Sequence, residues 1–222
     1  MISGEIRVGL VDGDLSIREG RRLLLNVPNK SVVVFEASRA TEAIEMTESY
    51  LVDVLIIDQR IQGMPGTELA RRISKLKLDG ITSAHILMTA PFANDSLRLE
   101  ALKAGAQELI SQEQGAPQLV DALRKLVAGE VCVDLAALKR LVGDISAKFD
   151  KSLVAALESF TPKETGYIRR VVEGEPIAAV ASSNEVAAYR VRKPVEKLLE
   201  SLGLTTLEQL QLRFIEAGLL SQ

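Results

Sequence analysis

Residues 54–58 read Val-Leu-Ile-Ile-Asp, a short apolar run that ends in a carboxylate. Four similar apolar runs occur in the first half of the chain, at Arg7–Val11, Val32–Phe35, His85–Met88 and Glu108–Ile110. Between them lie stretches in which apolar residues recur at helical spacing. Short runs rich in Val, Ile and Leu that alternate with amphipathic helices are typical of a parallel sheet covered on both faces. Residues 1–128 therefore predict an α/β doubly wound domain with a five-stranded parallel sheet.

The last third of the chain has a helical pattern throughout. Thr161-Pro162-Lys163-Glu164 combines a capping hydroxyl, a proline at the first helical position and an acid at the third, which is a strong helix start. Further helices are expected at about 177–182, within 187–202 and at 207–217. Residues 129–157 also have apolar residues three and four apart, and we interpret them as a helical linker. The predicted organisation is thus a domain over 1–128, a linker over 129–157 and an all-α domain over 158–222.

Composition and targeting signals narrow the class of protein. The chain has 222 residues, of which 47% are hydrophobic and 26% charged, as expected of globular domains. One cysteine, Cys132, and one histidine, His85, exclude an internal disulfide and a zinc site built from Cys and His alone. The start has no signal-peptide pattern, and no apolar stretch approaches the roughly 18 residues of a membrane helix. We expect a cytoplasmic protein without a membrane partner.

Polar residues end three of the predicted strands. Asp12 follows the first strand, Asp58 ends the third, and Thr89 ends the fourth. In a doubly wound sheet, ligands bind outside the carboxyl ends of the strands, so these side chains are expected to lie together. Crowded carboxylates are costly unless a cation compensates them, and a divalent metal ion is the usual one.

The segments around these residues resemble, in order and spacing, the motifs of response-regulator receiver domains. They are Val11-Asp12-Gly13-Asp14, Ile57-Asp58-Gln59-Arg60, Met88-Thr89-Ala90 and Ala101-Leu102-Lys103-Ala104-Gly105-Ala106, and the resemblance covers about residues 5–128. It implies the flavodoxin-like fold of a receiver. It also implies that Asp58 is the phosphoacceptor, that Asp12 and Asp58 hold Mg²⁺, and that Thr89 is the switch hydroxyl that contacts the phosphoryl group.

Three positions depart from the receiver pattern, and one of them is Leu109, which stands where the pattern has an aromatic switch residue. Gly13 replaces the second of two adjacent acids, and Gln112 replaces the lysine that pairs with the phosphoryl group. Losing a metal carboxylate and a phosphate-pairing cation should weaken both Mg²⁺ binding and phosphorylation of Asp58. We therefore expect a receiver that keeps its shape with impaired chemistry, and Mg²⁺ as the one candidate cofactor. Ordinary phosphorylation of Asp58 is the alternative.

The C-terminal third resembles the LuxR-type helix-turn-helix of NarL- and FixJ-like response regulators. The resemblance covers about residues 158–218 and rests on Phe160-Thr161-Pro162-Lys163-Glu164, Gly174 and Leu202-Gly203-Leu204. It implies that the helix within 187–202 enters the major groove of double-stranded DNA. Its basic side chains are the predicted DNA contacts, namely Arg190, Arg192, Lys193 and Lys197.

This module also departs from its family. Glu185 replaces the glycine of the turn, and Ala187 replaces the capping hydroxyl residue. Pro194 falls within the predicted recognition helix, which either continues through it or begins at it, in which case Arg190–Lys193 would lie in the turn. Residues 151–222 carry nine basic and nine acidic side chains, which sum to zero charge.

Together these features predict a transcription regulator rather than an enzyme. No nucleophile–base pair and no glycine-rich phosphate loop is recognisable in the sequence. The expected partners are double-stranded DNA, a second copy of the chain, and a histidine kinase or another protein. A homodimer would use a face of the receiver or the final helix at 207–220. The alternative function is a regulator that acts through protein–protein interaction without specific DNA binding.

Overall fold

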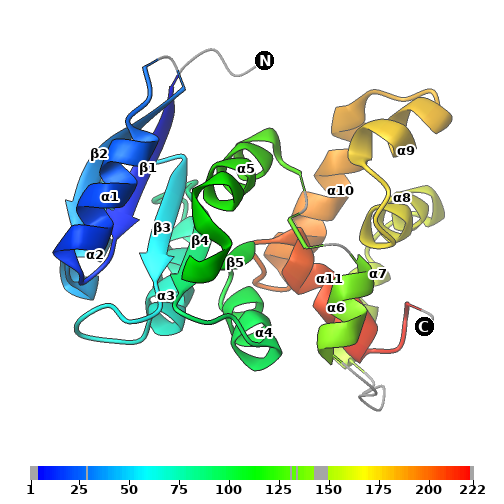
Figure 1. Cartoon of the computed structure of the whole chain (residues 1–222). Coiled ribbons are helices and arrows are strands. Elements are labelled where there is room, and N and C mark those ends of the chain that lie inside the picture. The colour runs from blue at the N-terminus through cyan, green and yellow to red at the C-terminus, as the bar shows by residue number, and fades with distance from the viewer. Residues whose placement is uncertain (1–4, 29, 131, 134, 143–149, 221–222) are drawn as a thin grey trace. The chain divides into compact units, whose positions relative to one another are not determined.

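The computed structural model describes residues 5–28, 30–130, 132–133, 135–142 and 150–220 (Figure 1). The chain divides into two compact units, Met1–Cys132 and Val133–Gln222. The first unit contains every strand of the described residues, and the second is helical.

The sheet of the first unit has the order β2-β1-β3-β4-β5, and all its pairs are parallel. Its strands are β1 (Ile6–Val11), β2 (Ser31–Ala37), β3 (Val54–Asp58), β4 (His85–Ala90) and β5 (Glu108–Ser111). The predicted five-stranded doubly wound sheet is therefore confirmed. Strand order reverses between β1 and β3, which fixes the edge where a ligand pocket is expected.

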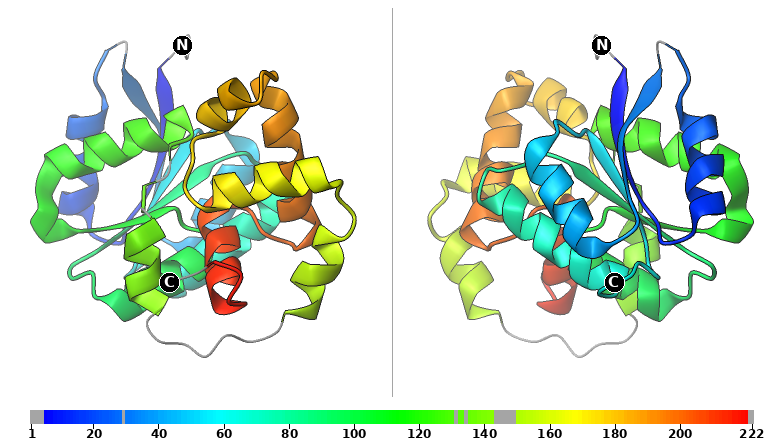
Figure 2. Two further views of the ribbon diagram at one scale, coloured as in Figure 1. Left: turned by 90° about the vertical axis from the view of Figure 1, so that its right-hand side faces the viewer. Right: turned by 90° about the vertical axis from the view of Figure 1, so that its left-hand side faces the viewer.

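Helices cover both faces of this sheet (Figure 2). They are α1 (Leu15–Leu25), α2 (Ala40–Ser49), α3 (Gly66–Leu78), α4 (Asp95–Lys103) and α5 (Gly115–Ala128), with a short 3₁₀ helix, η1 (Gln112–Gln114), before α5. Alternate residues of β3 point to opposite faces. Val54 and Ile56 belong to the core beneath α1 and α5, whereas Leu55 and Ile57 belong to the core beneath α2, α3 and α4. Burial on both faces explains why β3 is apolar until its final aspartate.

The second unit is an all-helical bundle around its own core. Its helices are α6 (Leu135–Val142), α7 (Lys151–Leu157), α8 (Pro162–Val172), α9 (Ile177–Ser183), α10 (Ala188–Ser201) and α11 (Leu207–Glu216). The expected capping box at Thr161 and Glu164 starts α8. Helices α6 and α7, which the sequence analysis interpreted as linker, lie in this unit: α6 packs on α11, and Leu153 of α7 is fully buried in the core.

Helix α11 is rich in apolar residues, which pack inside the second unit against α6 and against the core formed with α8 and α10. Leu210, Leu212 and Phe214 are all buried within the second unit. A dimer through the final helix at 207–220 was expected because that helix carries more apolar residues than one narrow core stripe needs, and packing inside the unit removes that reason.

Helix α10 passes through Pro194 without interruption. The alternative in which the helix begins at Pro194 is wrong, because α10 starts at Ala188 and Pro194 lies inside it. An interior proline costs about 3 kcal/mol through its missing backbone donor. Burial of Val191, Val195 and Leu198 offsets that cost, since these residues hold α10 in the core. Arg190–Lys193 are consequently helical.

Among the described residues, no helix is long and apolar enough to cross a membrane.

Candidate functional site

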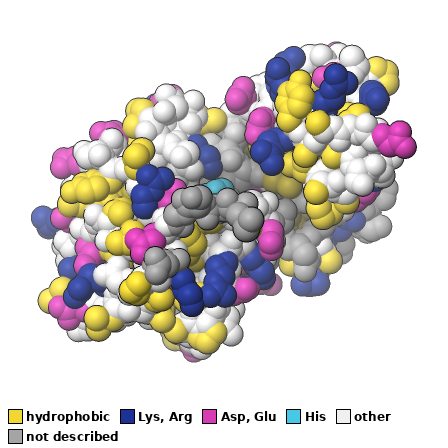
Figure 3. All heavy atoms as spheres, turned by 90° about the horizontal axis from the view of Figure 1, so that it is seen from above, with side chains coloured by type: hydrophobic (Ala, Val, Ile, Leu, Met, Phe, Trp, Pro, Cys, Tyr) yellow, Lys and Arg dark blue, Asp and Glu magenta, His cyan; other side chains and the backbone are white. Residues whose placement is uncertain are grey.

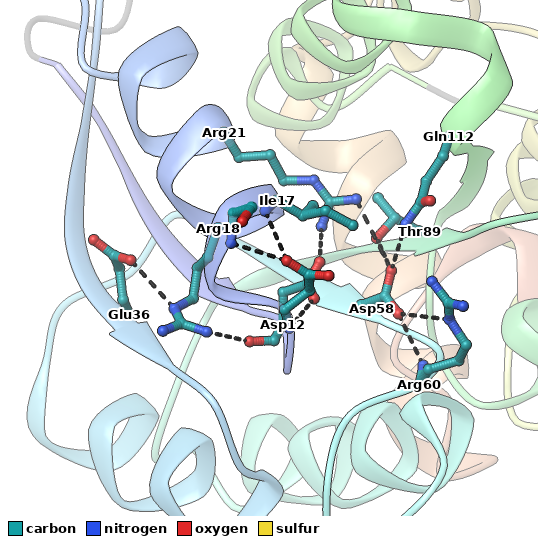
Figure 4. Close-up of polar contacts among 11 residues, drawn as sticks. Asp12, Ile17, Arg18, Arg21, Glu36, Asp58, Arg60, Thr89 and Gln112 are labelled. Carbon is teal, nitrogen blue, oxygen red and sulfur yellow. Dashed lines mark hydrogen bonds and ion pairs between the residues drawn. The ribbon is translucent and has the colours of Figure 1, made fainter.

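The carboxyl ends of β1, β3 and β4 bring together the three polar residues that the sequence singles out. Asp12, Asp58 and Thr89 are 3%, 2% and 3% exposed, respectively (Figure 4). Asp58 and Thr89 are direct partners in the β3–β4 register, so their side chains share one face of the sheet. The sequence-predicted cluster is therefore present in the structure.

Both carboxylate oxygens of Asp58 have hydrogen-bond donors. The backbone N–H of Arg60 donates to Oδ1 at 2.9 Å, and Thr89 Oγ1 donates to Oδ2 at 3.1 Å. Gln112 Nε2 lies 3.4 Å from the same Oδ2, and the Arg60 side chain lies 3.9 Å from Oδ1. The position at which the receiver pattern has a lysine is thus within reach of Asp58, but it offers a neutral amide.

Arg21 enters the pocket from α1 and is not among the site residues predicted from the sequence. Its Nη1 donates to Asp12 Oδ2 at 2.8 Å, and its Nη2 lies 3.9 Å from Asp58 Oδ2 (Figure 4). The Arg21 side chain is only 11% exposed. One signal was available: α1 begins beside the carboxyl end of β1, so a long side chain two turns into this helix can reach back to the strand ends.

Burial dominates the electrostatics of the Asp12–Arg21 pair. Desolvation raises the pKa of Asp12, and the neighbouring Asp58 charge adds to the rise, whereas the Asp14 backbone N–H and Arg21 oppose it. Desolvation also lowers the pKa of Arg21, and both carboxylates oppose that change. Guanidinium groups remain protonated in proteins, so Arg21 supplies a fixed positive charge between the two acids.

Asp14 does not replace the acid missing at position 13. Its side chain accepts hydrogen bonds from the N–H groups of Ser16 and Ile17 and so caps α1. Only its backbone contributes to the pocket, by donating to Asp12 Oδ1 at 2.9 Å. A Cβ atom at Gly13 would meet nothing closer than 3.6 Å, so the backbone here leaves room for a side chain.

This donor set does not fit a divalent cation as it stands. Mg²⁺ takes hard oxygen ligands in an octahedral shell at about 2.0–2.1 Å. In the part of the chain that the structure describes, no group of three or more His, Cys, Asp or Glu side chains could hold a metal ion. The pocket offers two carboxylates whose oxygens already accept hydrogen bonds, and Arg21 is a competing cation between them.

A second candidate site is a groove of about 440 Å³ in the helical unit, between α8 and α10. Three of the four predicted DNA-contacting residues line it, namely Arg190, Lys193 and Lys197. Lys163 from the start of α8 and the exposed Tyr189 complete its rim. Figure 3 shows Lys and Arg side chains gathered on this unit, on the right of the view.

The residues of α10 differ in how they relate to the groove. Arg190, Lys193 and Lys197 are three and four positions apart, which places them along one side of the helix. Lys197 Nζ also lies 5.2 Å from the centroid of the Phe160 ring, which restricts where its charge can go. Arg192 is exposed but does not line the groove, and Glu196 follows it one turn later on the same face.

The turn between α9 and α10 carries backbone strain at Glu185. Its φ of 53° lies in the left-handed region, and it is the sole non-glycine residue with positive φ among those described. This is the position at which the helix-turn-helix family has glycine, for which the conformation is free of steric cost.

Comparison with known proteins agrees with this architecture. The sequence family described as "Response regulator receiver domain" matches residues 8–124. A relative from Mycobacterium tuberculosis, named "Probable transcriptional regulatory protein NarL", is 25% identical over 201 residues, which cover 90% of this chain and 89% of the relative.

Solved structures extend the comparison to both units. A LuxR-family two-component response regulator from Aurantimonas is 28% identical with a TM-score of 0.53, over 61% of this chain and 94% of that one. A structure titled as two RcsB dimers bound to two parallel DNAs is 18% identical with a TM-score of 0.53, over 94% of this chain and 98% of that one, a likeness of fold. With the receiver family matched over more than half of its length, the chain belongs to the response regulators and has the organisation of their NarL-type members.

Proposed function

We propose that this protein is a DNA-binding transcription regulator of the two-component response-regulator type. The observation that carries the proposal is the row of Arg190, Lys193 and Lys197 along one side of α10, at the rim of a groove. Guanidinium groups can bind guanine bidentately in the major groove, and ammonium groups neutralise phosphates. Arg192 is a proposed contact too, with a smaller effect, because it lies off the groove beside Glu196.

The groove also answers the objection that residues 151–222 have zero net charge. Affinity for DNA depends on the local potential where phosphates approach rather than on the sum over a domain. Lys163, Arg190, Lys193 and Lys197 outnumber Glu164 at the groove, and Glu164 is engaged with Thr161 in the capping box.

The names of the relatives support the same function. The M. tuberculosis relative is named a transcriptional regulatory protein, and the RcsB structure contains dimers on DNA. By analogy we propose that this chain works as a homodimer on double-stranded DNA in the cytoplasm, without enzymatic activity of its own. A histidine kinase or another protein would provide the input.

We further propose that the receiver is impaired in Mg²⁺-dependent phosphorylation. Asp58 would be its phosphoacceptor and Thr89 its switch hydroxyl, with Asp12 and Asp58 as a weak metal site at most. Gly13 supplies no third carboxylate, and Gln112 offers a neutral amide where a lysine would pair with a phosphoryl group.

Fluorescence anisotropy tests DNA binding. The full chain is titrated onto random and onto selected genomic duplexes at several salt concentrations. We expect tighter binding to selected DNA, a steep loss with salt, and a large loss of affinity in Arg190→Ala. Arg169→Ala is the matched control, because Arg169 is an exposed arginine of α8 that does not line the groove. Absence of binding even at low salt would exclude the function.

Amide NMR of the full chain with Mg²⁺ and beryllofluoride or a small phosphodonor tests the receiver separately. An impaired receiver predicts no shifts at Asp58 and Thr89 with about millimolar ligand. Clear shifts there would instead establish ordinary phosphorylation.

The second candidate function is regulation through protein–protein contact without specific DNA binding. Exposed apolar residues of α1 favour it, since Leu15 and Leu23 are 59% and 73% exposed. The anisotropy experiment separates the two functions, because only the first requires salt-sensitive binding to a duplex.

A further inference from the structure

We propose that Arg21 is a built-in counter-cation that takes the place of a divalent metal ion between Asp12 and Asp58 and keeps the pocket closed to metal. The inference deepens the proposed impairment of the receiver and is independent of DNA binding.

The geometry of the guanidinium is the first reason. A single planar group reaches both acids, with Nη1 at 2.8 Å from Asp12 Oδ2 and Nη2 at 3.9 Å from Asp58 Oδ2. These two oxygens lie at the carboxyl ends of the adjacent strands β1 and β3, and a cation shared by the two carboxylates would have to lie between them. Because the guanidinium keeps its proton, it stays positively charged when a second cation approaches.

Hydrogen bonding of all four carboxylate oxygens within the folded chain is the second reason. The remaining oxygens accept from the N–H groups of Asp14 and Arg60, and Asp58 Oδ2 also accepts from Thr89. Arg18 adds a further bond, donating from Nη1 to the backbone oxygen of Asp12 at 2.7 Å. A metal ion would have to compete with these donors for the carboxylate oxygens, and its charge would be added beside a buried Arg21.

Charge balance is the third reason. Asp12, Asp58 and Arg21 sum to one negative charge, which the partly exposed Arg60 side chain faces at 3.9 Å. If Arg21 lost its guanidinium and position 13 gained an acid, three carboxylates would remain, and one divalent cation would restore the same balance. A Cβ at Gly13 would make only ordinary van der Waals contacts, the nearest at 3.6 Å. The pocket is therefore two substitutions from a metal site.

The inference can be tested by titrating the full chain with Mn²⁺. Binding is detected by water-proton relaxation and by broadening of the amide signals of Asp12, Asp58 and Thr89. Wild type is expected to show no specific site at or below about 1 mM metal. Arg21→Met, which keeps the apolar stem and removes the charge, should bind at least about tenfold more tightly, and Gly13→Asp/Arg21→Met more tightly again. Asp12→Asn added to Arg21→Met should abolish the gain.

Arg22→Met is the matched control, since Arg22 lies next to Arg21 on α1 but pairs with Glu36 outside the pocket. It should titrate like wild type. The proposal is overturned if wild type broadens at the pocket with about 1 mM Mn²⁺ or less, a result that needs no variant to fold. It is equally overturned if Arg21→Met and Gly13→Asp/Arg21→Met, folded by circular dichroism, bind metal no better than wild type.

This titration contains neither DNA nor phosphodonor, so its outcome is separate from that of the proposed function. A wild-type chain that binds Mn²⁺ yet also binds selected duplexes would refute the role of Arg21 and leave the regulator intact. A chain that excludes metal but binds no DNA would support the role of Arg21 and refute the DNA-binding function.

Discussion

Asp150 and Arg213, which are 63 positions apart in the sequence, form a two-nitrogen ion pair that joins the start of α7 to α11. Arg213 Nε and Nη2 donate to Asp150 Oδ2 at 2.9 and 2.7 Å. The other oxygen, Oδ1, caps α7 by accepting from the N–H of Leu153 at 3.0 Å and from the hydroxyl of Ser152. The Asp150 carboxylate therefore fixes both the beginning of α7 and the position of α7 against α11.

Removing this carboxylate should loosen α7 and α11. We expect Asp150→Ala to cost about 1–2 kcal/mol, the usual value of a helix cap with a charged partner. Hydrogen bonds from Ser152 and Leu153, helped by Arg213, lower the pKa of Asp150 to about 2. The contribution of ionised Asp150 to the free energy of unfolding is therefore complete above about pH 4 and is lost as pH falls toward 2. Amide hydrogen exchange of α11 in the full chain measures it. Lys151→Ala, at the exposed neighbour, should leave exchange unchanged.

Gly66 should tolerate no side chain, because α3 begins directly against the end of β3. A Cβ there would lie 2.5 Å from the backbone oxygen of Asp58 and 2.8 Å from Gln59 Cα. Gly66→Ala is expected to destabilise the first unit by about 2–3 kcal/mol, since backbone must move. Gly20→Ala is the contrast within α1, where a Cβ meets nothing within 4 Å, and it should stabilise by about 0.5–1 kcal/mol. Calorimetric unfolding that ranked the two variants the other way would contradict this packing.

Glu185 offers a substitution that should improve the protein. Glycine accepts φ near 53° without steric cost, so Glu185→Gly should stabilise the second unit by about 1 kcal/mol. Glu185→Gln removes the charge and keeps the strain, so it should leave stability unchanged. Thermal unfolding separates the two effects. If the turn approaches DNA phosphates, both variants should bind duplexes more tightly.

His85 makes the stability of the first unit sensitive to pH near neutrality. It is the only histidine of the chain. Burial, and then the charge of Lys77, lower the pKa of His85, while Gln107 and Asp53 oppose the change. A lowered pKa in the folded state means that stability is complete above about pH 6.5 and falls as pH drops below it. Unfolding temperatures from about pH 8 to about pH 5 should show this slope, and His85→Gln should flatten it. A stability difference between wild type and His85→Gln that shifts in favour of wild type as the pH is lowered would contradict the sign.

Lys163 should contribute to DNA affinity although it lies outside the recognition helix. It lines the same groove as Arg190 and Lys193, but it starts α8 rather than α10. Lys163→Ala should weaken binding to all sequences alike and reduce the slope of log affinity against log salt by about 1, the signature of one lost phosphate contact. Lys151→Ala, an exposed lysine of α7 away from the groove, should keep the slope.

Much of the first unit follows from its sequence. The continuous apolar run of β3, the similar runs separated by stretches of helical spacing, and the polar residues that end three strands are sufficient to predict the sheet and the meeting of Asp12, Asp58 and Thr89. These residues meet because the carboxyl ends of parallel strands lie at one edge of the sheet. Arg21 could not be assigned in this way, because a long arginine on an amphipathic helix is most often solvated. Only the path of its side chain shows that it turns inward.

In the second unit, tertiary packing overrides what the local sequence predicts. The sequence identifies Pro194 as a helix breaker, yet α10 continues because apolar neighbours on both sides of the proline are buried. Tertiary packing outweighed a local cost of about 3 kcal/mol. The same holds for α6, whose role as the cover of α11 depends on a contact between distant segments.

The strand order β2-β1-β3-β4-β5 affects the order in which the first unit can fold during synthesis on the ribosome. β1 is made first, but it must be held between β2 and β3, and Asp58 gains its Thr89 partner only when β4 has joined. Parallel neighbours cannot pair through a tight hairpin, so each addition waits for a complete crossover helix. Asp58 therefore reaches its native environment only after β4 and Gln112 have been made, whereas the pair of Asp12 and Arg21 needs only the end of β1 and α1.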